Sequence, residues 1–436
     1  MTALIVAILG SVSIAGVLVL RGESLRSAFS ATGLTEMRCL RWYGYDDSWG
    51  MMLAAYQKKT ANPSTDMYKI FFEDHAKFQY PPSSLLLLDL FPRSITRSMD
   101  SQTGGRTLAR RLLWVSAAAV LLTLVVSSLI LKTGFERWYG KQAGGSFRLD
   151  CLRLALSLAL GLLYYPVMVA QEGSQIQVYL NFFAGLAILM SFYGRKALSG
   201  ACIGLCCLVK PQYGIVLLWF VLRRDWKFLR GFLSIFLPGT AVAIARFGLR
   251  DHFRYLDVLK TISRQGETYW SNQSANGLLN RFLGNGDPTY FGNTFSSYHP
   301  VVYGLTLLSS LMVLALALWP RGSADHPKDS SGGVVDLAIV LAAATLASPI
   351  AWNHHYGVFF PIFAVALPPL MSFRPAGKWT AFLLALSYVM MADVMLRPNV
   401  IFSNRWTGLA GSHLLYGAFI LFGLLLAFRA KMIRSS

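Results

Sequence analysis

Apolar runs of 17 or more residues recur almost from one end of this 436-residue chain to the other. About 20 apolar residues in a helix, rising 1.5 Å each, cross the roughly 30 Å hydrocarbon core of a bilayer. Charged residues make up only 14% of the chain, against about 25% in a soluble domain. Too few charges are available to coat a water-soluble surface, so we predict a single all-α polytopic membrane unit rather than a soluble enzyme.

The apolar runs predict about twelve transmembrane segments, each bounded by charge, Gly or Pro. The first run, 4–20, has the apolar core of a signal peptide, but no Lys or Arg precedes it and the chain stays membranous afterwards, which favours a retained span. The other segments are predicted near 112–131, 151–169, 176–193, 198–209, 212–222, 229–247, 301–319, 334–350, 354–371, 377–395 and 411–428.

The stretch 198–222 is divided into two short helices because Lys210-Pro211 stands at its middle. A charge and a proline at mid-bilayer depth are costly for one continuous helix. Two short helices instead place Lys210 at the outer water interface and keep the following basic cluster, 223–230, inside. Lys210 at this break can meet a phosphate group, or it can simply snorkel to the interface.

Basic residues predict the orientation. With the N-terminus inside, the short cytoplasmic connections and the C-terminal tail hold 18 Lys and Arg, whereas the short outer connections hold 3. Both termini are then cytoplasmic, and the two long loops, 21–111 and 248–300, lie outside. We therefore expect one integral membrane domain over 1–436, with these two loops forming the active-site face.

The net charge of +19 does not indicate a nucleic-acid partner, because Lys and Arg sit at the ends of apolar runs. No Walker pattern or glycine-rich phosphate loop is visible, so we expect no nucleotide cofactor. Neither a disulfide nor a metal site is expected, although Glu73, Asp74 and His75 offer metal-capable groups. The five cysteines are Cys39, Cys151, Cys202, Cys206 and Cys207.

The first long loop looks folded and carries acidic residues at a predicted helix start. The run 49–56 has a helix-like apolar stripe, preceded by Asp46-Asp47-Ser48. Asp47 has two explanations here: as an N-cap that satisfies free backbone N–H groups, or as a general base that takes a proton from an attacking hydroxyl. Further amphipathic helices are expected in this loop, including the apolar stretch 85–90 after Pro81-Pro82.

Several motifs, in order and with compatible spacing, together resemble glycosyltransferase family 87, whose members are multi-spanning GT-C enzymes. The first follow Asp47 in the first long loop, and the next is a glycine-containing helix that ends in Lys-Pro. The last two lie in the second long loop and where the predicted spans 334–350 and 354–371 meet. The motifs are Asp47, Ala54-Ala55, Asp66-Met67-Tyr68, Phe78-Gln79-Tyr80-Pro81-Pro82, Gly200 to Pro211, Asn272-Gln273-Ser274 with Gly277 and Arg281, and Ser348 to His355.

The resemblance implies a GT-C-like bundle that transfers a sugar, typically mannose, from a polyprenyl-phosphate donor to an acceptor hydroxyl, with inversion at the anomeric carbon. It implies Asp47 as the base, with Asp46 as the neighbouring alternative, and His355 as a second catalytic group. The substrate-binding residues that it implies are His354, Lys210, Asn272, Ser274, Arg281, Tyr80 and Gln175. The family usually shows Gly-Gln directly before a span, whereas this chain reads Gln171-Glu172-Gly173-Ser174-Gln175, so that pair is split or displaced.

Other interpretations stay open at this point. The histidine pair and the aromatic residues Tyr269 and Trp270 are also typical of a membrane interface, although these aromatics could stack on a sugar. Arg281 could be a solvated loop residue. A transporter or flippase of lipid-linked sugars would prefer ionisable residues within the spans and a two-halves repeat, and a scaffold would need no acidic loop. A polyprenyl-phosphate sugar other than mannose is the closest competitor.

The expected partners are the polyprenyl-phosphate donor, a lipid-linked glycan acceptor and the bilayer itself, and the oligomeric state is left open. The positive-inside bias suits a bacterial inner membrane, with the active site on its periplasmic side.

Overall fold

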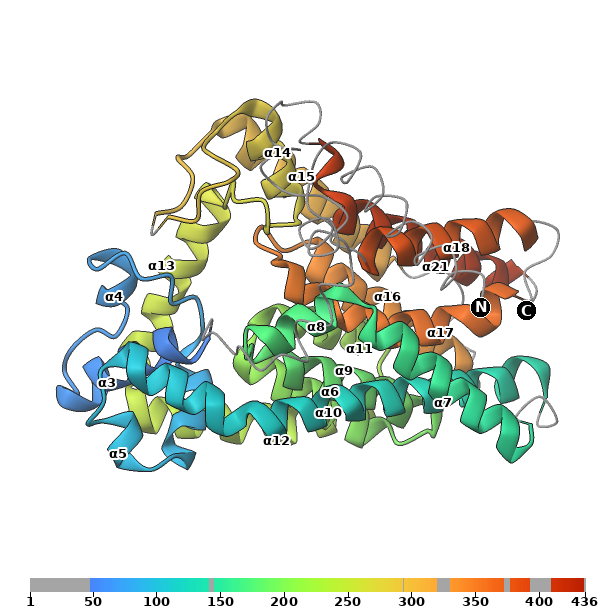
Figure 1. Ribbon diagram of the computed structural model, residues 1–436, viewed down its shortest axis with the longest axis horizontal. Helices are drawn as coiled ribbons and strands as arrows, with labels where there is room; N and C mark the ends of the chain where they lie inside the picture. The colour runs from blue at the N-terminus through green and yellow to red at the C-terminus, as the bar shows by residue number, and fades with distance from the viewer. Residues whose placement is uncertain are drawn as a thin grey trace, which may run out of the picture.

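The computed structural model describes residues 48–140, 145–292, 294–319, 330–371, 377–392 and 409–434. These residues form helices, with an isolated antiparallel bridge between Asn272 and Trp352 (Figure 1). The predicted all-α class is therefore confirmed for the described part of the chain. The predicted first span, 4–20, lies outside it, as do Asp46 and Asp47.

The described part of the first long loop is folded into short helices. α3 begins at Trp49, where the sequence places a helix start, and continues to Ala61. Ser48 holds its N-cap position, and Asp47 directly before it lies outside the described residues. The helices of this loop are α3 (Trp49–Ala61), α4 (Lys69–Phe72), η2 (Pro82–Leu90) and α5 (Arg93–Thr96).

α6 (Ser101–Tyr139) is longer than the predicted span at 112–131. It starts at Asp100, whose carboxylate accepts hydrogen bonds from the backbone N–H groups of Gln102 and Thr103. Hydropathy alone misses this start because the first turns of the helix are polar. Its 39 residues extend about 58 Å at 1.5 Å per residue. α6 packs against α3 at one end and against α9 and α17 further along, and so joins the first long loop to the bundle (Figure 1).

Two predicted spans are broken in the structure. The run 151–169 forms α7 (Phe147–Leu162) and α8 (Tyr165–Glu172), which are bent by 64°. Pro166 in the first turn of α8 has no N–H to continue the preceding helix and restricts the residue before it. The run 354–371 forms the 3-10 helix η5 (Asn353–Val358) and then α17 (Phe359–Met371).

The predicted break at Lys210-Pro211 is confirmed. α10 ends at Val209, Lys210 has an extended backbone, and η4 follows at Pro211. The elements here are α9 (Gln177–Phe192), α10 (Lys196–Val209), η4 (Pro211–Gly214), α11 (Ile215–Leu222) and α12 (Trp226–Phe247).

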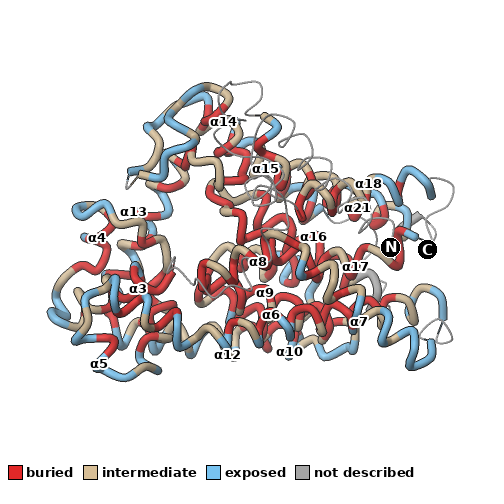
Figure 2. The backbone as a smooth tube through the Cα atoms, viewed as in Figure 1, coloured by how far each residue is buried: buried red, intermediate tan, exposed pale blue. Residues whose placement is uncertain are grey.

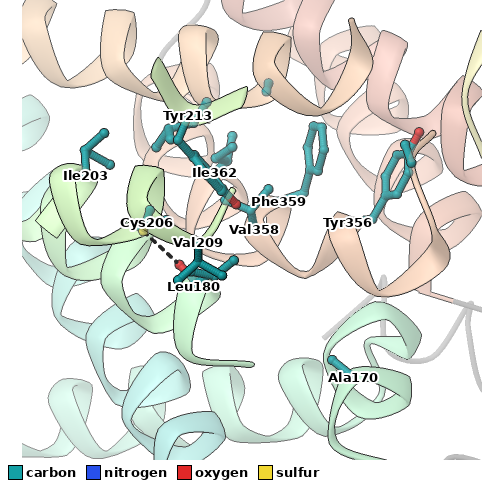
Figure 3. Packing of buried hydrophobic residues seen from close by; sticks show 14 of the residues in the cluster. Ala170, Leu180, Ile203, Cys206, Val209, Tyr213, Tyr356, Val358, Phe359 and Ile362 are labelled. Carbon is teal, nitrogen blue, oxygen red and sulfur yellow. Dashed lines mark hydrogen bonds between the residues drawn. The ribbon is translucent and has the colours of Figure 1, made fainter. Parts of the chain in front are cut away.

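Glycines explain how α10 lies so close to α12. A Cβ at Gly200 would come within 2.1 Å of the Phe228 carbonyl oxygen, and one at Gly204 within 2.8 Å of the Phe232 carbonyl oxygen. Two small residues four apart on one face allow such backbone approach between membrane helices. On the opposite side Cys206 is buried, with its thiol 3.8 Å from the Leu180 carbonyl oxygen (Figure 3).

The chain is an integral membrane protein. Among the described residues, four helices are long and apolar enough to cross a bilayer, α6, α12, α15 and α21, and the bent pair α7–α8 makes a possible fifth. The count of about twelve spans stays a prediction.

Buried residues gather along α16 and α17 at the centre of the bundle (Figure 2). The remaining helices are α13 (Leu249–Gln265), α14 (Ala275–Leu283), α15 (Pro300–Leu318), α16 (Ser330–Leu346), α18 (Gly377–Ala392) and α21 (His413–Arg434).

Ion pairs tie the two long loops together. Lys59 Nζ lies 2.6 Å from a carboxylate oxygen of Asp251, which is fully buried, and Arg254 Nε lies 3.0 Å from Asp66. Buried charges are stable only when they are paired. α13, at the start of the second loop, is therefore fixed against the first loop, and the space between them has defined walls.

Candidate active site

A cavity of about 1110 Å³ lies between the two long loops and the helical bundle. Its walls come from the first loop, α8, the break between α10 and α11, α13, α16 and η5. Five of the residues predicted to bind substrate or act in catalysis line it: Tyr80, Gln175, Lys210, His354 and His355.

Lys210 lies at the cavity because the helix is broken at Lys210-Pro211, between α10 and η4. It has 7% of its surface exposed, and its ammonium donates a 2.7 Å hydrogen bond to Gln177 Oε1. Gln177 Nε2 in turn donates to Asn181 Oδ1 at 2.8 Å. A buried cation on the wall of a cavity attracts anionic groups such as phosphate.

The two histidines lie in the 3-10 turn η5, which precedes α17 and is not among the described helices that are long and apolar enough to cross a bilayer. Their rings are 4.6 Å apart and nearly perpendicular, at 83°. Burial, followed by the charge of nearby Lys210, lowers the pKa of both imidazoles well below the usual range, so both are neutral at physiological pH. Within the described ranges, His355 Nδ1 has no hydrogen-bond partner, which leaves it for a ligand in the cavity.

The start of α3 meets the same wall. Ser48 Oγ donates to Gln175 Oε1 at 2.6 Å and lies 3.3 Å from the hydroxyl of Tyr80. Trp49 Nε1 donates to the Ser174 carbonyl at 2.9 Å. Asp46 and Asp47 lie outside the described residues, but the residue that follows them directly in the chain contacts two residues that line the cavity.

Ser174, in the run from Gln171 to Gln175, has a backbone conformation that serine rarely adopts. Ser174 has φ +46°, in the left-handed region that favours glycine, and Gln175 after it lines the cavity. Serine adopts this conformation at a cost that glycine does not have.

We expect Ser174→Gly to raise the free energy of unfolding by about 1 to 2 kcal/mol. Glycine adopts the left-handed backbone conformation without the strain that serine has there. The substitution also removes the buried serine Oγ, which has no hydrogen-bond partner among the described residues. Thermal unfolding of the detergent-purified protein measures this. Ser174→Ala is the control, because it removes only the hydroxyl. If the glycine variant is no more stable than the alanine variant, the backbone at Ser174 is not strained.

Asn272, Ser274 and Arg281 do not line the cavity in the part of the chain that the structure describes. Asn272 Oδ1 accepts from the Ala351 N–H at 2.9 Å, and Ser274 caps α14 while donating to the Pro349 carbonyl at 2.7 Å. Arg281 donates to the Asn272 carbonyl at 2.9 Å and is 5% exposed, so its interpretation as a solvated residue is wrong. These side chains hold the second loop against the segment before η5, and their contact with substrate stays a prediction.

Sequence reasoning did not single out several residues of the cavity wall. Lys77 forms a buried ion pair with Glu267 and so joins the two loops beside the cavity. Trp352 and Asn353 stand inside a motif that was recognised mainly for its histidines. Phe291 has no local signal at all, because only the fold of the second loop brings it there.

No group of three His, Cys, Asp or Glu side chains in the described ranges is arranged to hold a metal ion. Of the metal-capable run in the first loop, Asp74 pairs with Lys58 at 2.9 Å. The absence of a metal requirement stays a prediction.

The fold and the site are therefore those of an integral membrane helical bundle with a cavity lined by a buried lysine and two histidines. Residues 78–349, more than half of the chain, match the model of glycosyltransferase family 87. The chain belongs to this family and is a glycosyltransferase.

Named relatives agree with the family. The chain is 26% identical over 319 residues to a polyprenol-phosphate-mannose-dependent alpha-(1-2)-phosphatidylinositol mannoside mannosyltransferase of Mycolicibacterium smegmatis, covering 69% of this chain and 68% of that protein. It is 26% identical over 237 residues to the corresponding pentamannoside mannosyltransferase of Mycobacterium tuberculosis, covering 54% of this chain and 50% of the relative. A remote similarity, with TM-score 0.34 and 13% identity over 92% of this chain and 76% of the other, is to ArnT from Cupriavidus metallidurans, solved with undecaprenyl phosphate.

Proposed function

We propose that this enzyme transfers mannose from polyprenyl-phosphate mannose to a hydroxyl of a lipid-linked glycan, with inversion at the anomeric carbon. The family membership and the donor named for the mycobacterial relatives support this reaction. The observation that carries the proposal is Lys210, a buried cation on the wall of a cavity of about 1110 Å³.

The cavity suits an amphiphilic donor because it has a polar and an apolar part. Lys210, Gln175 and the histidine pair belong to the polar part. Four helices contribute the apolar part through Ile215 of α11, Leu259 and Ile262 of α13, Leu314 of α15 and Ala344 of α16, and Ala347 follows directly after α16. A polyprenyl tail along these side chains places its phosphate at Lys210 and the sugar beside the histidines.

In the proposed step Asp47 accepts the proton of the acceptor hydroxyl as its oxygen attacks the anomeric carbon. The bond between that carbon and the phosphate oxygen breaks, and polyprenyl phosphate leaves with both electrons of the bond. Lys210 stabilises the negative charge of the leaving phosphate. The contacts of Ser48 with Gln175 and Tyr80 support Asp47 as the base, because they bring the start of α3 to the cavity.

We place the reaction on the outer face of the membrane, with the two long loops outside. The distribution of basic residues supports this orientation, since 18 Lys and Arg fall in the short connections and the tail on the opposite side, against 3 in the short connections on this side. A bacterial inner membrane is the location that we propose, with both the donor and the acceptor reaching the cavity from the outer leaflet.

The test is transfer of radiolabelled mannose from polyprenyl-phosphate mannose to a membrane lipid extract by the purified protein. Polyprenyl-phosphate glucose and polyprenyl-phosphate arabinofuranose are assayed in parallel. Transfer from the mannose donor alone supports the proposal, and transfer from another donor alone would change the sugar. No transfer from any of them would refute a polyprenyl-phosphate transferase.

A further inference from the structure

We propose that an aromatic wall of the cavity, formed by Tyr269, Phe291 and Trp352, together with Asn353, is the binding site for the acceptor sugar, a hexopyranose. The inference rests on the proposed function and goes beyond it, because it names the part of the cavity that the acceptor occupies and the residues that select it. All four residues line the cavity.

The three rings form a compact cluster. The ring centroids of Tyr269 and Phe291 are 5.2 Å apart, those of Phe291 and Trp352 are 5.9 Å apart, and those of Tyr269 and Trp352 are 6.3 Å apart. Phe291 is 51% exposed although it is fully apolar. Aromatic residues of an interfacial belt contact lipid head groups at the outside of the protein, whereas these rings line a cavity. A pyranose offers the apolar C–H face that such rings cover.

The backbone behind the wall is held in place before any ligand binds. Residues 271–273 pair with 351–353: the Gln273 N–H donates to the Ala351 carbonyl at 2.8 Å, and the Asn353 N–H donates to the Ser271 carbonyl at 3.1 Å. The side chain of Asn272 adds its hydrogen bond to Ala351. This pairing keeps Trp352 beside Tyr269, and such preorganisation strengthens binding because little ordering remains to be done.

Phe291 is also fixed from the first loop. The ammonium of Lys77 lies 4.4 Å from the centroid of its ring and 5.0 Å from that of Phe295, while the same lysine pairs with Glu267. A cation over the ring face stabilises the orientation of the ring. Phe291 therefore presents a defined surface to the cavity although it lies in a loop.

Asn353 supplies the polar contact that distinguishes a sugar from a purely apolar ligand. It is 3% exposed, and its Nδ2 donates to the hydroxyl of Tyr165 at 3.2 Å. Among the residues that the structure describes, its Oδ1 has no hydrogen-bond partner. An unpaired acceptor on a cavity wall, next to Trp352, fits a sugar hydroxyl, since a buried polar atom left without a partner is costly.

The order of groups along the cavity assigns this wall to the acceptor rather than to the donor. Lys210, His354 and His355 line the same cavity, so a donor phosphate at Lys210 leaves its sugar beside the histidines. Asn353 and Trp352 precede these histidines directly in the chain. The sugar over the aromatic wall then lies next to the donor sugar. It is the acceptor sugar, which carries the attacking hydroxyl.

The experiment compares the Michaelis constants of donor and acceptor in variants of the wall. The probes are octyl α-mannopyranoside and octyl β-glucopyranoside as acceptors, with polyprenyl-phosphate mannose as donor. Phe291→Leu and Trp352→Leu each remove one ring, and we expect each to raise the KM for the preferred pyranoside about tenfold while the donor KM changes less than about twofold. Asn353→Leu should have the same asymmetric effect.

Phe295→Leu is the matched control, because Phe295 also packs under Lys77 but does not line the cavity. It should leave both constants unchanged. Phe291 is exposed, so its variant tests the wall even if Trp352→Leu does not fold. An equal rise in the donor KM, an unchanged acceptor KM, or transfer to membrane lipids with none to either pyranoside would overturn the inference while the proposed function stands. No transfer from any polyprenyl-phosphate sugar would refute the proposed function and this inference with it.

Discussion

Asp47→Asn is expected to lower kcat for sugar transfer by about 10² to 10⁴-fold, the usual contribution of a general base. Asparagine has the size of aspartate and can still accept a hydrogen bond from the acceptor hydroxyl, but it cannot take up its proton. Both Michaelis constants should change little, because the loss is confined to the transition state. The measurement is the initial rate of mannose transfer at saturating donor and acceptor.

Two control variants separate the base from its acidic neighbours. Asp46→Asn tests the adjacent residue, and Asp74→Asn tests a carboxylate that lines the cavity but pairs with Lys58 at 2.9 Å. Both should retain activity within about threefold if Asp47 alone takes the proton. A large loss in Asp46→Asn with an active Asp47→Asn would move the role by one residue.

Helix ends that depend on neighbouring residues in the chain could be predicted from the sequence. Pro211 ends α10 because proline cannot continue the helix, and the charge of Lys210 makes that break favourable at a polar cavity. The helix start at Trp49 follows from an apolar stripe that begins after Ser48. These two positions contribute directly to the candidate site.

The rest of the site depends on contacts between distant residues, which a pattern along the chain does not contain. Asn272 is of a residue type that often binds sugar hydroxyls. Its amide oxygen instead accepts a hydrogen bond from the N–H of Ala351, 79 positions away. Arg281 looks like a surface cation, yet its guanidinium satisfies buried carbonyls behind the wall. Phe291 looks like a loop residue and lines the cavity. Polar residues that build the scaffold and those that face the ligand are of the same types, so only the fold separates them.

Lys210→Met is expected to lower kcat/KM for polyprenyl-phosphate mannose at least 100-fold, about 2.7 kcal/mol of transition-state stabilisation. Methionine keeps an unbranched apolar stem but removes the charge that meets the phosphate, and this charge is needed most when the phosphate leaves. Lys210→Arg keeps the charge and should retain part of the activity, although the guanidinium does not reproduce the ammonium's contact with Gln177.

Gln212→Met is the matched control for the charge, because Gln212 follows on the same break and lines the same cavity. It should lower kcat/KM for the donor by less than about threefold, since it removes only a neutral hydrogen-bonding group. The assay varies donor concentration at a saturating concentration of octyl α-mannopyranoside, or of the glucoside if that is preferred. If Lys210→Met stays within threefold of the wild type, the lysine does not meet the phosphate, and its placement is that of an interfacial side chain that snorkels toward water.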